Sequence, residues 1–175
     1  MESLGRTYDL VACIAPKDLQ DNAHNTGVRV SLKDCESVDF VLYKGAGTAA
    51  QDPQIDIQQA NAATGGLAKD LDCIAHFFAK SETTLDGDEV WTEYTQTKAS
   101  EVALGTATTN LTAAEEEGIY VFHVEASAMD FAGGYYWAFV YIADVGANAQ
   151  LGCVLAIRTG LLVQQKATSL RNPNA

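Results

Sequence analysis

Apolar and polar residues alternate along short segments of this chain, and the alternation predicts β-strands. Apolar side chains occupy every second position at Val28, Val30 and Leu32, and again at Ile55 and Ile57. Alternate residues of a strand point to the same face, so each segment has one apolar face for a core. The pattern therefore predicts half-buried strands near residues 28–33 and 55–58.

Further strands are predicted where β-branched and aromatic residues cluster between turn-forming residues. These segments are 8–14, 37–44, 90–95, 119–125, 135–143 and 151–157. Pro16 is expected to end the first of them, because proline lacks the N–H that a ladder needs. Asp86-Gly87-Asp88 predicts a hairpin turn, since glycine tolerates the positive φ of such turns.

Two stretches have weaker patterns. Residues 67–80 fit both helical and strand spacing, and we favour a strand because β-branched and aromatic residues are frequent there. Residues 98–117 are rich in alanine and threonine and then acidic, which predicts a long connection with at most one helical turn. The helix-or-strand alternative for residues 67–80 stays open at this point.

About eight short strands without alternating helices predict a mainly β fold. We expect a single-domain antiparallel β-sandwich of jelly-roll type with extended terminal arms, because two sheets must cover each other's apolar faces. A length of 175 residues fits one domain. The expected boundaries are an N-terminal arm with the first strand at 1–26, the sandwich at 27–163 and a polar tail at 164–175.

The charge of the chain excludes several classes of partner. The 23 acidic and 11 basic residues give a net charge of −12, and the basic residues are scattered singly. Binding to nucleic acid or to a membrane surface needs clustered Lys and Arg, so we expect neither partner. Charged residues make up only 19% of the chain, which leaves neutral surface available for burial against other proteins. Self-association, most simply as a homotrimer, is therefore expected.

The four cysteines are widely spaced and form no CxxC pair. Three of them lie in apolar runs, where a thiol behaves as a small hydrophobic group. We therefore expect unpaired thiols, with Cys73 and Cys153 buried. The first residues lack the basic and apolar regions of a secretion signal, which favours a reducing compartment.

Candidate chemistry is sparse. The three histidines, His24, His76 and His123, have no metal-ligand spacing, and Ser127 has no neighbouring base. The glycine-rich segment 45–48 lacks the lysine of a phosphate-binding loop. We therefore expect no catalytic residue, no metal and no cofactor, and we interpret the protein as a non-enzyme.

Two other features have a functional alternative. The acidic runs Asp70-Leu71-Asp72 and Asp86-Gly87-Asp88-Glu89 offer oxygen ligands for calcium, although a solvated loop is the simpler interpretation. Aromatic residues on one face of segment 135–143 suit sugar stacking. Those residues are Trp137, Phe139 and Tyr141, opposite Ala138, Val140 and Ile142. Because both faces are apolar, we favour a central strand covered on both sides.

Three segments resemble a family of small virion proteins of tailed bacteriophages. They are residues 4–10 (Leu-Gly-Arg-Thr-Tyr-Asp-Leu), residues 41–48 (Val-Leu-Tyr-Lys-Gly-Ala-Gly-Thr) and residues 142–152 (Ile-Ala-Asp-Val-Gly-Ala-Asn-Ala-Gln-Leu-Gly). The resemblance implies a capsid decoration or cement protein that binds the major capsid protein on the outer surface of the shell. Synthesis would take place in the host cytoplasm.

Alternatives from the same and from other classes remain. A head–tail adaptor or tail structural protein would occupy a ring position in the virion, and a carbohydrate-binding module or small hydrolase would use the aromatic strand or the acidic loops. For the decoration role we assign partner binding to the terminal arms. The assigned residues are Arg6, Tyr8, Arg171, Asn172 and Pro173.

Overall fold

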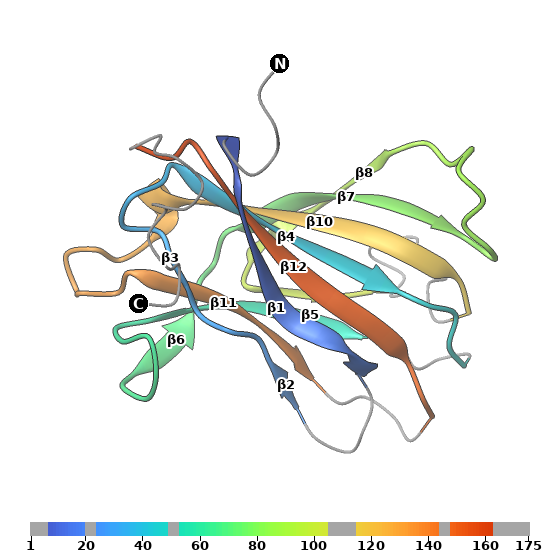
Figure 1. The fold of residues 1–175 in the computed structure, drawn as a ribbon, viewed down its shortest axis with the longest axis horizontal. Helices are drawn as coiled ribbons and strands as arrows, with labels where there is room; N and C mark the ends of the chain where they lie inside the picture. The colour runs from blue at the N-terminus through green and yellow to red at the C-terminus, as the bar shows by residue number, and fades with distance from the viewer. Residues whose placement is uncertain (1–6, 20–23, 49–52, 105–114, 144–147, 163–175) are drawn as a thin grey trace.

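The computed structural model describes residues 7–19, 24–48, 53–104, 115–143 and 148–162 (Figure 1). Strands make up 57% of the chain and helix 3%, and two antiparallel sheets form one domain. The prediction of a mainly β, antiparallel sandwich is confirmed. The jelly-roll connectivity and the arm and tail boundaries stay predictions. No helix among the described residues is long and apolar enough to cross a membrane.

The larger layer, sheet A, has six strands in the spatial order β1-β12-β4-β10-β7-β8. Their bounds are β1 (Asp9–Asp18), β12 (Leu151–Thr159), β4 (Ser37–Lys44), β10 (Glu117–Glu125), β7 (Ile74–Glu82) and β8 (Thr92–Ala99). Segments from both ends of the described chain therefore lie side by side, since β1 pairs with β12. Residues Ala126–Ala128 after β10 form a short 3-10 helix, η1.

The second layer, sheet B, is built around two central strands, β11 (Trp137–Ala143) and β5 (Gln54–Ala60). Four short strands complete it: β2 (Asn25–Thr26), β3 (Val30–Ser31), β6 (Ala68–Asp70) and β9 (Glu101–Ala103). Strands β2 and β3 pair with β11, while β6 and β9 pair with β5.

The core consists of side chains from both sheets in one cluster. Its largest fully buried members are Tyr120, Phe40, Phe77, Phe122, Leu42, Ile55 and Ile57. The rings of Phe77 and Phe122 lie 5.4 Å apart, at a separation typical of favourable aromatic pairs. Burying such side chains contributes roughly 1.5–3 kcal/mol each, so this cluster is the main source of stability.

The first strand differs from its prediction at Pro16. Strand β1 continues through Pro16 to Asp18. It is one of the two edge strands of sheet A, and its register shifts between Ile14 and Lys17. Proline is tolerated at edges and bulges, because no ladder hydrogen bond is required of its nitrogen there. The expectation that Pro16 ends the strand is therefore wrong.

The predicted alternation also fails in two places. Val28 is 42% exposed and lies outside any strand, so the expected strand near residues 28–33 shrinks to β3. Asp56, expected on a solvent face, is buried in β5 between two buried isoleucines. Strand β5 is central in sheet B, and the Asp56 carboxylate accepts hydrogen bonds from the side chains of Gln58 and Ser100, which lie over it.

The uncertain stretches prove to be β-structure. Residues 67–80 contribute to strands β6 and β7, which confirms the strand prediction. Strands β7 and β8 pair as a hairpin whose connection, residues 83–91, contains Gly87 with a φ of 103°. The predicted strand at 90–95 is wrong at its start, because β8 begins at Thr92 and leaves Val90 and Trp91 exposed. Within the stretch expected as a connection, β8 runs to Ala99 and β9 follows it. Residues 105–114 lie outside the described part.

Candidate interaction surface

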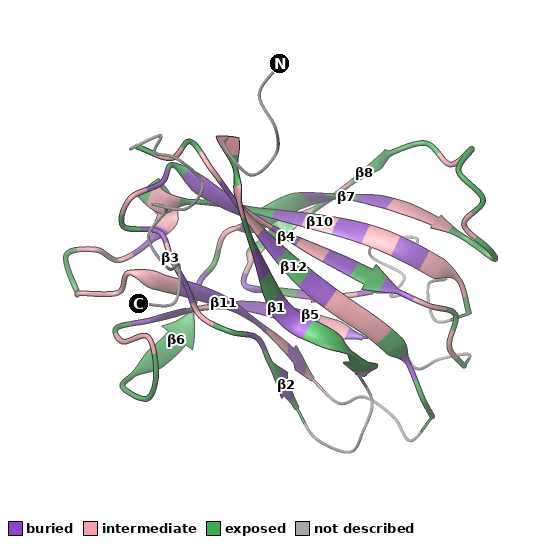
Figure 2. Cartoon of the chain, in the orientation of Figure 1, coloured by how far each residue is buried: buried purple, intermediate pink, exposed green. Residues whose placement is uncertain are grey.

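Apolar side chains cluster at the centre of the outer face of sheet A, the face turned away from sheet B. Buried and less buried residues alternate along β12, β4 and β10, seen as alternating bands in Figure 2. The buried set points to the core, so the other set points outward. The outward apolar residues are Val41, Tyr43, Phe78, Ile119, Val121, Cys153, Leu155 and Ile157. We call these eight residues the outer apolar face.

The strand register joins these side chains into continuous rows. Leu155 pairs with Val41, Val41 with Val121 and Val121 with Phe78, so one row crosses four strands. With strands spaced about 4.8 Å apart, the row spans roughly 14 Å. A second row contains Cys153, Tyr43 and Ile119. The apolar positions therefore form a patch rather than scattered single residues.

Several members of this patch are well exposed. Tyr43 is 47% exposed, Leu155 40% and Phe78 39%. Two further exposed residues, Leu10 and Leu151, extend the patch along β1 and β12. Contiguous apolar surface of this kind is uncommon on monomeric soluble proteins and marks interaction sites.

Charged and polar groups surround the outer apolar face. The His123 Nδ1 lies 2.6 Å from the Asp39 Oδ1, in a hydrogen-bond contact that links the central strands β10 and β4. The Lys80 ammonium lies 5.2 Å from the ring centre of Trp91. The eight residues of the outer apolar face are uncharged, while the acids Glu82, Glu93, Glu117 and Glu125 lie around them on the same side of sheet A.

An apolar groove of about 390 Å³ continues the patch at one end of sheet A. It is lined by Pro16, Lys17, Tyr43, Gly45, Leu151, Gly152 and Cys153. The backbone N–H of Gly45 donates to Leu151 O at 2.8 Å, and the Gln150 Nε2 donates to Gly45 O at 2.6 Å. These bonds fix the start of β12 against the end of β4, so the groove is preformed.

A polar concavity at the other end of the sheet gathers most of the candidate catalytic groups. It is lined by Cys73, Ala75, His76, Lys98, His123, Glu125, Ser127 and Ala128. The Ser127 Oγ donates to Glu125 Oε2 at 2.9 Å, while His123 bonds Asp39. Burial raises the pKa of the Cys73 thiol to about 12, so it is protonated at neutral pH. In the described ranges no serine or cysteine side chain bonds a histidine.

The acidic runs are only partly brought together. Glu82 joins Asp86, Asp88 and Glu89 in an exposed cluster with carboxylate oxygens within 4.8 Å of one another. The Glu89 carboxylate accepts backbone N–H bonds from Gly87 and Asp86, which lower its pKa. These bonds account for the loop shape without a cation. Asp70 and Asp72 are not part of this cluster.

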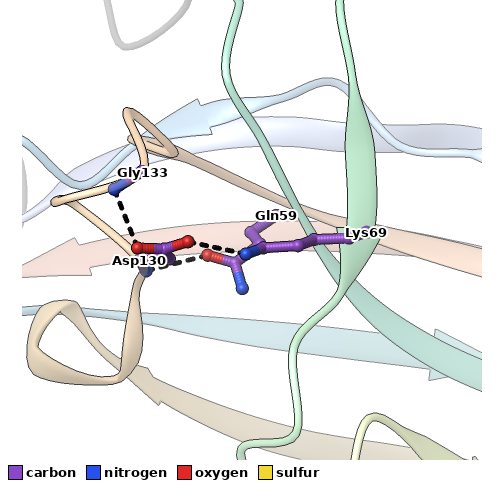
Figure 3. Close-up of polar contacts among 4 residues, drawn as sticks. All are labelled: Gln59, Lys69, Asp130 and Gly133. Carbon is purple, nitrogen blue, oxygen red and sulfur yellow. Dashed lines mark hydrogen bonds and ion pairs between the residues drawn. The ribbon is translucent and has the colours of Figure 1, made fainter.

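A separate polar network holds the loop after η1 against sheet B (Figure 3). The two Asp130 carboxylate oxygens accept from Lys69 Nζ at 2.6 Å and Gly133 N at 2.8 Å. The Asp130 N–H donates to Gln59 Oε1 at 2.9 Å. The bond from Lys69, followed by that from Gly133, lowers the pKa of Asp130. Both carboxylate oxygens are engaged, and we assign this network a structural role.

The aromatic strand β11 is buried on its core face and only partly covered on the opposite face, where Trp137 and Tyr141 are half-buried. Ala138, Val140 and Ile142 are buried, and on the opposite face Phe139 is only 2% exposed. The Arg29 guanidinium lies 5.1 Å from the Phe139 ring centre, and His24 contacts Tyr141. An aromatic platform for sugar needs open ring faces, so this arrangement gives little support to sugar binding.

Tyr8 is the one predicted partner-binding residue that the structure describes. It is exposed and immediately precedes β1. Arg6, Arg171, Asn172 and Pro173 lie outside the described residues. Their role in binding stays a prediction.

The described features define a β-sandwich with one apolar outer sheet face. No protein-family model matches the chain, and no curated protein matches it. The function therefore has to be inferred from the surface of the molecule and from its sequence.

Proposed function

We propose that this protein is a structural subunit of a tailed-bacteriophage virion that decorates the outer surface of the capsid. The observation that carries the assembly role is the outer apolar face of sheet A. Exposed apolar surface is stabilised when a partner removes it from water, at roughly 25 cal/mol per Å². In a larger particle, a neighbouring subunit covers such a surface permanently.

The sequence resemblance supplies the virion part of the proposal. Two of the segments that carry it, residues 41–48 and 142–152, meet in the structure where Lys44 pairs with Gly152. Together they contribute Tyr43, Gly45, Leu151 and Gly152 to the apolar groove. The resembling segments thus form one surface feature, which supports a role in contacts between proteins.

The net charge of −12 favours the outside of the shell. Packaged DNA carries dense negative charge, and an acidic protein is repelled from it. Attachment to the major capsid protein would use the terminal arms that contain Arg6 and Arg171, because arginine donates several hydrogen bonds in a fixed geometry.

The copy number per particle tests this proposal. Quantitative mass spectrometry of virions purified from the encoding phage should find hundreds of copies for a lattice position, against about a dozen for a ring. Antibody labelling in electron microscopy should then mark the whole head surface. About a dozen copies with labelling at the head–tail junction would favour the adaptor alternative. Absence of the protein from purified particles would overturn the virion role.

A further inference from the structure

We infer that a second copy of this chain covers the outer apolar face, in a two-fold dimer whose two A sheets stack face to face. The inference deepens the proposed function by naming the occupant of this face. It rests on that proposal only in treating the face as an interaction surface, and it does not depend on the virion assignment.

The size of the sheet suits a stable dimer. Six strands give five spacings of about 4.8 Å, or roughly 24 Å across sheet A. Strands of 8 to 10 residues are roughly 26–33 Å long at about 3.3 Å per residue. The projected area of the whole sheet is therefore about 700 Å², with the outer apolar face at its centre and polar residues at its rim, close to the ~800 Å² that each partner buries in an interface of standard size.

The charge distribution favours a copy of the same chain over a foreign partner. Two chains of −12 repel each other unless they meet where little charge is exposed. The centre of the outer apolar face meets this condition, because its eight residues are uncharged and the acids Glu82, Glu93, Glu117 and Glu125 lie at its rim. A basic foreign partner would gain more at the acidic loop that carries Asp86, Asp88 and Glu89.

The face is also suited to two-fold symmetry. In an isologous contact each group meets the same surface of the second copy, so the surface must be self-complementary. The hydrogen-bonded side chains of Asp39 and His123 place an acid and an imidazole next to each other on the central strands β4 and β10. Rotation about an axis near this pair brings Asp39 of one copy toward His123 of the other. A flat apolar sheet can therefore pair with itself, whereas the homotrimer expected from composition needs two different surfaces.

Sedimentation equilibrium of the full-length protein tests the inference directly. The wild type, with a monomer mass of 18.7 kDa, should fit twice that mass at micromolar concentration. Leu155→Lys places a charge in the row that crosses four strands and should raise the dimer Kd at least about 100-fold, since a buried unpaired charge costs several kcal/mol.

The matched control makes the same change elsewhere. Leu67→Lys alters an exposed leucine between the sheet B strands β5 and β6, away from the outer apolar face, and should leave the dimer Kd unchanged. Circular dichroism and thermal unfolding, measured at a concentration where all proteins are monomeric, should show that both variants retain the wild-type fold. If Leu155→Lys does not fold, Tyr43→Lys at an exposed position of the same face replaces it.

The accessibility of Cys153 gives a second measurement of whether the outer apolar face is covered. Cys153 lies on the outer apolar face beside Tyr43. Its alkylation by iodoacetamide should slow as protein concentration rises through the dimer Kd, because the second copy covers it. In Leu155→Lys the rate should stay constant over the same range.

The outcomes separate this inference from the proposed function. The inference is overturned if the wild type remains monomeric at about 100 μM or forms a trimer. It is also overturned if Leu155→Lys dimerises as tightly as the wild type. A dimer that depends on the outer apolar face supports it even if the protein is absent from virions. Conversely, a monomer present in hundreds of copies on the shell would leave the virion role standing and the dimer rejected.

Discussion

The Cys73 residue is only half-buried, yet burial strongly affects the pKa of its thiol. Cys73 and Cys153 were expected to be buried, but both are only half-buried, while Cys13 and Cys35 are buried. All four thiols are free. Burial nevertheless raises the pKa of Cys73 to about 12 and that of Cys13 to about 11. The cysteine positions in apolar runs predicted unpaired thiols, but not which ones the fold would enclose.

These pKa values predict selective thiol reactivity. The thiolate is the reactive form, and at pH 8 a pKa near 12 leaves only about one thiol in ten thousand ionised. We expect Cys73 and Cys13 to react with iodoacetamide at least about 100-fold more slowly in the folded protein than after unfolding. Mass spectrometry of each labelled peptide measures this, with the half-buried Cys153 of dilute protein as the comparison. Fast labelling of native Cys73 at pH 8 would contradict the assignment.

Asp56 is a buried acid whose ionisation opposes folding. Burial raises its pKa above 3.8, although hydrogen bonds from Gln58 and Ser100 act in the opposite direction. A raised folded-state pKa means that the folded protein binds this proton more tightly than the unfolded chain. The cost of the charge is therefore absent below pH 3.8 and appears as the pH rises through the folded-state pKa.

Asp56→Asn should consequently stabilise the protein at pH 7, by about 1 kcal/mol, because it removes a desolvated charge. The gain relative to wild type should shrink as the pH is lowered toward 4. Urea unfolding at several pH values measures both effects. Asp72→Asn, at an exposed position, is the control and should change stability little. A variant less stable than wild type at pH 7 would show that the carboxylate is needed.

At the scale of the strands, local composition predicted some elements well. Strand β4 has the predicted bounds, Ser37–Lys44, and β10 and β12 extend their predictions by two residues at one end. Each is rich in β-branched and aromatic residues, so the local signal is strong. The short strands β2, β3, β6 and β9 have two or three residues and depend on pairing with β5 or β11. Such elements have too few residues for a local pattern.

The outer apolar face was not predicted, for a related reason. The run Phe40-Val41-Leu42-Tyr43 shows that β4 is apolar on both sides. The sequence does not reveal whether a second layer covers each side, because this depends on the order of the strands. Strand β11, also apolar on both sides, has the buried Phe139 on its outer side between the half-buried Trp137 and Tyr141, whereas the outer side of β4 carries the exposed Tyr43. In a two-layer fold, an apolar run therefore indicates either a covered strand or an interaction surface, and the order of the strands is needed to distinguish the two.

Two glycines that line the apolar groove differ in the space available for a Cβ atom. A Cβ at Gly152 would lie 2.6 Å from Leu19 Cδ1 and 2.9 Å from Tyr43 O, whereas at Gly45 its nearest neighbour is Leu151 O at 3.7 Å. Gly152→Ala should therefore destabilise the protein by about 1–3 kcal/mol, because overpacking forces β12 away from β4. Gly45→Ala should change the free energy of unfolding by less than about 0.5 kcal/mol. Urea unfolding of both variants checks the pair, and equal stabilities would contradict the packing of β12 on β4.

At the scale of the whole molecule, the high negative charge opposes association between copies, whereas the outer apolar face favours it. Charge of one sign keeps molecules apart over distances set by the ionic strength, while apolar contact acts only at close range. Association of like-charged copies through the outer apolar face therefore depends on how well the solvent screens the repulsion. A particle subunit with this balance stays dispersed when dilute and assembles where its local concentration is high.

Salt should consequently strengthen the proposed dimer. The screening length falls from about 30 Å at 0.01 M to about 10 Å at 0.1 M ionic strength, which removes most repulsion between the two −12 chains. We expect the dimer Kd to fall about tenfold between these salt concentrations, equivalent to 1.4 kcal/mol. Sedimentation equilibrium in NaCl measures it, with Leu155→Lys as the control that should remain monomeric throughout. An interface held mainly by ion pairs would instead weaken with salt, so a Kd that rises across this range would show that the copies meet through charged surface and not through the outer apolar face.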